Sequence, residues 1–324
     1  MNYRDFITRL QVSIESLKAN EVDRFAEVLA NLDRAIASAL VNGELVDMTP
    51  KQLNEVLLTL ADDISAELSA FSNALYESSV DIANHVTATE VAFIASVAST
   101  APKAVKVTDK IADLPVTGFG GASVKTVLST FEDTEKERII NTIRLARHQG
   151  KTNTQINQII RGTRKNNYQD GILNITARNA KAVTNTTVQH MASEARAETA
   201  RKLNITDIKV VATLDGRTSS TCRSLDGKIL PLEQKPPYHV NCRTSYIFWT
   251  GVDPKLRSSL DGTIKYTTYY EWLATQDPTF QDQVLGAERG QMFRDGGIPP
   301  KKFAELQLDR NFRPRTLKQI KELL

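Results

Sequence analysis

The stretch from Leu214 to Arg243, LDGRTSSTCRSLDGKILPLEQKPPYHVNCR, contains both cysteines of the 324-residue chain. Cys222 and Cys242 are accompanied there by Asp215, His239 and two Asp-Gly pairs, which are residue types that ligate metals or form tight turns. Helical periodicity dominates the sequence before this stretch, and short elements follow it. We therefore expect the fold to be organised around these residues.

Long helices are predicted for the N-terminal part of the chain. Apolar residues recur at steps of three and four along residues 3–40, 53–75 and 80–98, which places them on one face of a helix. Asn42-Gly43 is typical of a helix end, and Thr49-Pro50 of a helix start. The remaining faces are acidic and suit contacts with another protein.

Four parts of the chain follow from these patterns. An acidic helical region covers residues 1–100, and a linker rich in Pro and Gly covers 101–122. A middle domain at 123–250 contains predicted helices at 124–149, 152–162 and 176–203. A basic extension with short helices completes the chain at 251–324.

Three short β-strands are predicted close to the cysteines. They cover Ile208–Leu214, Gly227–Leu230 and Thr244–Trp249, where β-branched and aromatic residues are bounded by turn signals. The predicted fold class is mainly α with a small α+β unit. Long N-terminal helices and a helical middle precede a compact β-containing Cys/His motif near residues 205–250, and short C-terminal helices follow it.

Charge is unevenly distributed along the chain. Residues 1–100 carry 6 basic and 15 acidic side chains, whereas residues 161–202 carry 8 and 3, and residues 289–324 carry 9 and 4. The basic parts are candidates for facing an acidic partner such as nucleic acid, or else form an ordinary solvated surface. The helix–Gly–helix outline near 152–162 also resembles a DNA-reading helix-turn-helix, although many helical corners share it.

Several function classes are disfavoured by the sequence. No run of about 18 apolar residues is present that would span a membrane, and the first residues do not have the layout of a secretory signal. We therefore expect synthesis in a reducing cytoplasm, where two cysteines act as thiols or metal ligands more often than as a disulfide. The sequence contains no H-E-x-x-H motif and no Gly-rich phosphate loop, so these signatures of an enzyme are missing.

The ligand chemistry of the central stretch indicates a metal site. Sixteen residues separate Cys222 from His239, and two separate His239 from Cys242, so that one turn presents an imidazole and a thiolate. Asp215 would complete a four-coordinate zinc site with these three residues. The spacing is not that of a common zinc finger, and buried thiols with a hydrogen-bonded histidine are an alternative. A Cys222–His239 nucleophile pair, or an Asp215–His239 hydrogen bond without metal, are two further alternatives.

The same residues carry a resemblance to a known family. The motif comprises Asp-Gly-Arg-Thr-Ser at 215–219, Cys222, Leu225-Asp226-Gly227, and Pro236-Pro237-x-His239-x-x-Cys242-Arg243. It resembles the signature of phage minor head proteins, the phage head morphogenesis family that includes Mu F-like and siphophage minor head proteins. The resemblance runs from about Leu128 to Thr250. Its structural residues are Arg217, Asp226, Gly227, Pro237 and Arg243.

The resemblance implies a structural virion protein rather than an enzyme. It implies a minor head component at the portal vertex or capsid interior, made in the host cytoplasm, that acts in head morphogenesis and in DNA packaging or ejection. Its implied partners are portal and capsid proteins, with packaged double-stranded DNA as a further candidate. In that family His or Cys occupies the position of Cys222, which supports zinc bound by Asp215, Cys222, His239 and Cys242. A Cys/His enzyme, a toxin-like domain or a DNA-binding module is the alternative.

Overall fold

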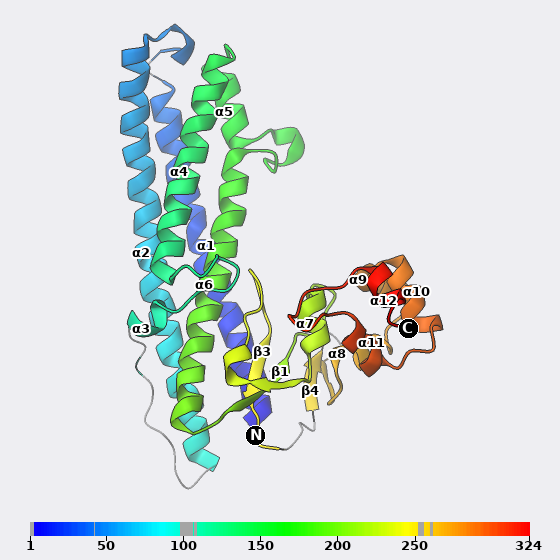
Figure 1. Cartoon of the computed structure of the whole chain (residues 1–324). Helices are drawn as coiled ribbons and strands as arrows, with labels where there is room; N and C mark the ends of the chain where they lie inside the picture. The colour runs from blue at the N-terminus through cyan, green and yellow to red at the C-terminus, as the bar shows by residue number, and fades with distance from the viewer. Residues whose placement is uncertain (1–2, 42, 98–105, 107–108, 252–255, 260–261) are drawn as a thin grey trace. The chain divides into compact units, whose positions relative to one another are not determined.

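The computed structural model describes residues 3–41, 43–97, 106, 109–251, 256–259 and 262–324 (Figure 1). The chain forms two compact units, each assembled from segments that are far apart in sequence. Unit 1 comprises Met1–Glu15, Ala83–Lys106 and Ala192–Leu324, and unit 2 comprises Ser16–Ile82 and Val107–Met191. Helices dominate the described residues, and strands occur only as a small sheet and a hairpin, so the predicted fold class is confirmed.

Unit 2 is built entirely of helical elements in its described part. It contains α3 (Asp109–Ala112), α4 (Val124–His148) and α5 (Asn153–Arg161), and it shares α1 (Tyr3–Ala39), α2 (Pro50–Val97) and α6 (Ile172–Lys202) with unit 1. The apolar faces predicted from the spacing are buried, as at Leu32 and Ile64. Phe25, Phe71 and Phe131 bring α1, α2 and α4 together, with ring centroids 4.7 to 6.2 Å apart.

Helix α2 joins two helices that the sequence predicts separately. No Gly or Pro interrupts residues 51–97, so the helix continues through the expected break between 75 and 80. Ala98, the predicted last residue of the second helix, lies outside the described residues. The connection between α1 and α2 is held by Asn153, whose amide donates to the carbonyls of Leu40 and Gly43 at 2.7 and 2.8 Å.

The sheet of unit 1 consists of the three predicted strands, each with shorter bounds. They are β1 (Asp207–Val211), β2 (Ile229–Pro231) and β3 (Ser245–Phe248), paired antiparallel in the order β2-β1-β3. Ile208 and Phe248 pack on Ala197 and Ala200 of α6. Because these alanines are small, the helix can lie close to the sheet.

A buried ion pair connects this sheet to the helices of unit 1. The guanidinium of Arg196 in α6 contacts the Glu90 carboxylate in α2 with two hydrogen bonds of 2.9 and 3.0 Å, and both side chains are almost completely buried. Arg196 also donates to the carbonyl of Tyr246 in β3, and the Tyr3 hydroxyl donates to Glu90 at 2.6 Å. Four elements therefore meet at one charged, fully hydrogen-bonded core position.

Short elements follow the sheet, as the sequence predicts. The helices are α8 (Tyr269–Leu273), α9 (Pro278–Leu285), α10 (Ala287–Asp295), α11 (Pro300–Leu306) and α12 (Leu317–Lys321). An unpredicted hairpin of β4 (Leu256–Ser259) and β5 (Gly262–Lys265) precedes them. Tyr269, Tyr270, Trp272, Phe293 and Phe303 form an aromatic cluster around Leu214 at the start of the central stretch.

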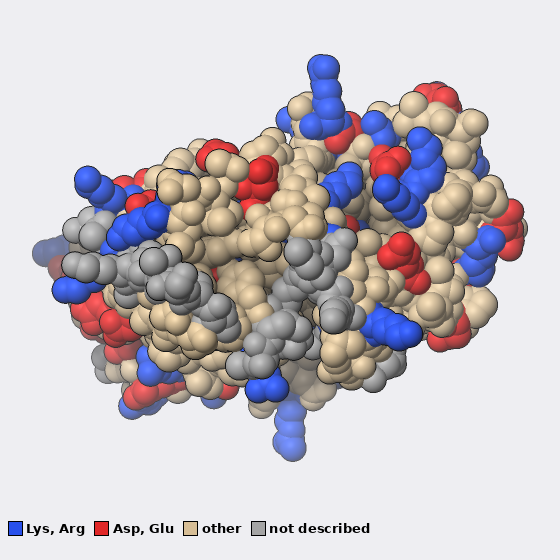
Figure 2. Space-filling view, turned by 90° about the horizontal axis from the view of Figure 1, so that it is seen from below, with Lys and Arg blue, Asp and Glu red and all other residues tan. Residues whose placement is uncertain are grey.

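The four-part division of the sequence is not tested by these compact units, because α1, α2 and α6 each contribute to both of them. Of the predicted linker, residues 101–105 and 107–108 lie outside the described part, and α3 falls within the remainder. On the face drawn in Figure 2, basic and acidic side chains are interspersed. No described helix combines the length and hydrophobicity that crossing a bilayer requires.

Candidate metal centre

The first ligand candidate, Cys222, lies in the first turn of α7 (Ser220–Leu225), a helix that the sequence analysis did not predict. Ser219 is its N-cap, and the Ser219 hydroxyl accepts a hydrogen bond from the Cys222 N–H at 3.3 Å. Serine three residues before a cysteine is the signal that could have indicated this helix start. The cap fixes the position of the Cys222 thiol, which is 2% exposed.

The second and third candidates share a tight turn. The Cys242 N–H donates to the His239 carbonyl at 3.2 Å, and Asn241 between them has a left-handed backbone with φ 59°. Asparagine tolerates this conformation better than most residues. The Nδ1 atom of His239 lies 2.8 Å from the Val240 carbonyl, so a proton on Nδ1 leaves Nε2 unprotonated, where it can accept from the Ser219 hydroxyl 2.7 Å away or ligate a metal.

The three ligand atoms converge to distances that suit a metal ion. The Cys222 Sγ lies 3.6 Å from the Cys242 Sγ and 3.2 Å from the His239 Nε2, and all three ligand atoms lie within 4.8 Å of one another. A tetrahedral zinc ion would separate two sulfurs by about 3.8 Å and a sulfur and a nitrogen by about 3.6 Å. The residues present therefore fit a zinc-type ion with little rearrangement.

The electrostatics of the three side chains also favour a cation. The hydrogen bond from Cys222 and the neighbouring His239 hold the pKa of Cys242 well below its usual range. Contact with Cys242 raises the pKa of His239, and contact with Cys242 together with burial raises the pKa of Cys222. The Ser219 and Thr244 side chains act in the opposite direction on the pKa of Cys222 and lower it, which favours a thiolate ligand.

Asp215, the fourth predicted ligand, is not brought into this group. Its two carboxylate oxygens accept hydrogen bonds of 2.7 and 2.8 Å from the Arg243 guanidinium. Thr218 and the Arg217 N–H also donate to Asp215, at 3.1 and 3.0 Å. Although burial opposes it, this pairing lowers the pKa of Asp215. The structure places Asp215 as the partner of Arg243, the residue directly after Cys242.

The other motif residues surround the centre. The side chain of Arg217 is 82% exposed, with its Nε 3.5 Å from Asp215, so it is a solvated neighbour of that carboxylate. Pro237 is buried and follows Pro236 through a cis peptide bond. The Pro236 carbonyl accepts a hydrogen bond from Ser193 in α6. The proline pair thus anchors the approach to His239 on α6.

Asp226 is the centre of a second buried network. Its carboxylate accepts hydrogen bonds of 2.7 Å from the N–H groups of Ala212 and Tyr269, and of 2.7 and 3.0 Å from Arg257. Gly227 has φ +77°, and a Cβ there would lie 2.9 Å from the Thr268 side chain. Arg257 was missed by the sequence reasoning because β4 has no clear strand pattern.

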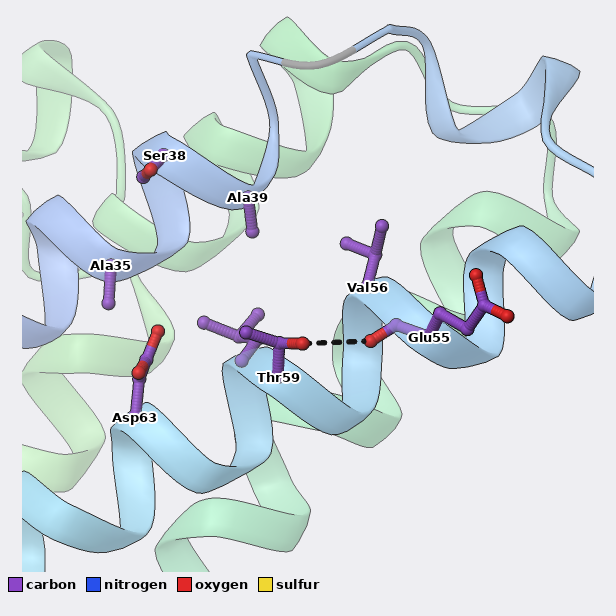
Figure 3. A pocket seen from close by; sticks show the side chains of 8 residues that line it. Ala35, Ser38, Ala39, Glu55, Val56, Thr59 and Asp63 are labelled. Atoms are coloured by element: carbon purple, nitrogen blue, oxygen red, sulfur yellow. Dashed lines mark hydrogen bonds between the residues drawn. The ribbon is translucent and has the colours of Figure 1, made fainter.

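Two hollows are relevant to function. One of about 20 Å³ adjoins the metal centre and is lined in part by Thr213, Thr218 and Ser219. The other, in unit 2, measures about 310 Å³ and lies between α1 and α2 (Figure 3). Its lining carries the carboxylates Glu55 and Asp63 beside the small residues Ala35, Ser38 and Ala39. The first has room for about one water molecule, whereas a typical ligand pocket measures about 300 to 1,000 Å³.

The part of the chain that contains this candidate site matches a known protein family. Residues 137–247 match the family described as Phage Mu protein F like protein. This segment belongs to the Mu F-like family. The Mu F-like segment runs from the middle of α4 to β3 and includes Asp215, Cys222, His239 and Cys242.

The match confirms the resemblance read from the central motif: the segment that contains this motif is similar to the Mu F-like proteins of the phage head morphogenesis family. Residues 1–136 and 248–324 lie outside the matched range, so the acidic helices and Arg257 belong to parts of the chain that this family does not cover. Comparisons with curated proteins and with solved structures found no match.

Proposed function

We propose that this protein is a minor structural component of a phage head that acts at or near the portal vertex during head morphogenesis. The Mu F-like match at residues 137–247 carries this proposal, because it covers the metal centre and the sheet that supports it. Portal and capsid proteins are its proposed partners, and DNA packaging or ejection are the steps in which it would act.

We further propose that Cys222, His239 and Cys242 hold a structural zinc ion. Zinc would join α7 to the turn that follows the proline pair, and a cross-link of this kind stabilises a small unit with few apolar residues. Zinc would favour the thiolate forms of both cysteines and hold the ends of the stretch together.

A catalytic role has one observation in its favour. The 3.2 Å contact between Cys222 and His239 is also the geometry of a thiol–imidazole nucleophile pair. The thiol is buried, however, the adjoining hollow is too small for a substrate, and Arg243 occupies both oxygens of Asp215. We therefore propose a non-enzymatic role. Rapid alkylation of Cys222 by iodoacetamide in the zinc-loaded protein would contradict it.

The acidic helices are the proposed surface for portal or capsid contact. Residues 16–82 of unit 2 carry 4 basic and 12 acidic side chains. Among the described residues, neither Glu55 nor Asp63 in the 310 Å³ hollow takes part in an ion pair, so both are available to a basic partner segment. Complementary charge would guide such a contact and make it sensitive to salt.

Association with purified assembly components tests the proposed function. The tagged full-length chain is incubated with portal rings and with procapsids, and bound protein is measured after sedimentation. We expect binding to portal-containing particles, and a Glu55→Lys/Asp63→Lys variant should bind more weakly. Glu77→Lys/Asp81→Lys, which makes the same charge change at two exposed positions of α2, is the matched control. If the chain sediments with neither portal rings nor procapsids, the proposal is wrong.

A second experiment locates the step. Phage lacking the chain are complemented with the wild type, and head yield, packaged DNA and DNA release are measured separately. Loss of head yield would assign the protein to assembly, whereas normal heads with reduced DNA content or release would assign it to packaging or ejection. Unchanged values for all three would overturn the proposal.

A further inference from the structure

The connection between α5 and α6 in unit 2 forms a closed loop, which we call the tip and define as residues 163–170, TRKNNYQD. Figure 1 shows it projecting sideways from the helices of unit 2. Its two ends meet at Gly162 and Gly171. A Cβ on Gly171 would lie 2.3 Å from the Arg161 carbonyl carbon, and one on Gly162 would lie 2.8 Å from the Gly171 nitrogen. Only glycine fits at this closure.

One carboxylate holds the tip in shape. Asp170 accepts hydrogen bonds from the Thr163 N–H at 2.7 Å, from the Thr163 hydroxyl at 2.8 Å and from the Asn166 amide at 2.8 Å. The Tyr168 N–H donates to the Thr163 carbonyl at 2.9 Å across the loop. Asp170, the only acidic residue of the tip, therefore uses both carboxylate oxygens for hydrogen bonds within the loop.

The tip presents strained and exposed residues. Asn167 and Tyr168 have φ values of 49° and 60°, in the left-handed region that aromatic residues rarely occupy. Tyr168 is 53% exposed, so burial does not offset the strain. A strained conformation in an exposed, well-bonded loop points to a functional use of the presented side chains.

The chemistry of those side chains indicates the partner. Arg164 and Lys165 are exposed, and neither forms an ion pair with another described residue, whereas the neighbouring Arg161 is paired with Asp33 at 2.8 Å. Arg, Lys, Asn, Gln and Tyr side chains are the usual donors to nucleic-acid phosphates. No aliphatic side chain occurs between 163 and 170, which argues against an apolar docking surface.

We propose that the tip binds the phosphate backbone of double-stranded DNA. Arg164 and Lys165 would neutralise two phosphates, and Asn167 and Tyr168 would donate to phosphate oxygens without reading base sequence. Residues 163–170 support this because the two basic side chains are exposed and the one acidic side chain, Asp170, is turned inward. DNA binding by the tip is separate from the proposed role in head assembly and is measured without phage particles. A failure of one proposal would therefore leave the other standing.

Fluorescence anisotropy with a labelled 24-base-pair duplex at several salt concentrations tests the proposal. We expect weak, salt-dependent binding by the full-length chain. In Arg164→Gln/Lys165→Gln the slope of log affinity against log salt should fall by about 2, since each lost phosphate contact removes about 0.9. Arg178→Gln/Lys181→Gln, which removes the same charge from exposed positions on α6, should change it much less.

Two further variants separate shape from charge. Tyr168→Ala should weaken binding without changing the salt slope. Asp170→Ala removes a negative charge, which by charge alone would strengthen binding, yet we expect weaker binding because the tip loses its hydrogen-bonded frame. Circular dichroism checks that each variant is folded.

The proposal would be overturned by no duplex binding at 50 mM salt, by equal loss in the tip and α6 charge variants, or by tighter binding by Asp170→Ala. Competition by polyglutamate as effective as competition by unlabelled duplex would also overturn it, and would assign the tip to an acidic protein surface instead.

Discussion

At the scale of single residues, the metal centre depends on three side chains that the sequence brings within 21 positions. Zinc analysis of the protein purified without chelator should find about one ion per chain. Cys242→Ser should lose the ion and destabilise the unit, since a structural zinc site contributes folding free energy directly. His148→Ala at the end of α4 is the control and should retain zinc. A folded wild-type protein without metal would show that the three residues are buried thiols and a hydrogen-bonded histidine.

Asp170 provides a pH-dependent prediction at the same scale. Hydrogen bonds from Thr163 and Asn166 lower its pKa to about 2. The carboxylate therefore supports the tip fully above its ordinary pKa near 3.8, and this support is lost as the pH falls through about 2. Side-chain carboxyl NMR should give a midpoint near 2 for Asp170. A midpoint close to 4 would mean that the tip is not held as described.

At the scale of elements, Asp226 joins Ala212, the residue directly after β1, to β4 and α8 through four hydrogen bonds. Asp226→Asn removes the negative charge opposite Arg257. The new amide NH₂ would also face N–H donors, so that at least one buried donor would lose its acceptor. The free energy of unfolding should fall by about 3 kcal/mol or more. Asp282→Asn in the partly exposed pair with Arg294 is the matched control, with an expected change of about 0 to 1 kcal/mol. Urea unfolding measures both, and equal effects would refute the assigned role of Asp226.

At the scale of the whole molecule, the proposed zinc site belongs to unit 1, while unit 2 has its own aromatic core of Phe25, Phe71 and Phe131. Chelation should therefore increase amide hydrogen exchange in β1, β3 and α7 and leave α4 unchanged. The double variant Cys222→Ser/Cys242→Ser should not respond to the chelator. Equal increases in α4 and β1 would show that the ion stabilises more than its own unit.

Helices and strands were largely predictable because local spacing determines which face is apolar. The stripe through Leu32 and Ile64, the short helix near 152–162 and all three strands of the sheet follow from such patterns. The break expected near residue 78 is absent because no residue there disfavours helix. Helix α7 and the β4–β5 hairpin were missed because each is short and lacks periodicity.

The sequence by itself determined the resemblance to Mu F-like proteins and the mainly helical fold, and it named as candidate ligands the three residues that the structure brings together, because these depend on residue types and their spacing. Only the tertiary structure assigned Asp215 to Arg243 and Asp226 to Arg257. A carboxylate near a cysteine in sequence can face a metal or a guanidinium, and the packing of separate elements decides which of them it meets. For the stretch Leu214–Arg243, the sequence supplied four candidate ligands, and folding brings three of them together, namely Cys222, His239 and Cys242.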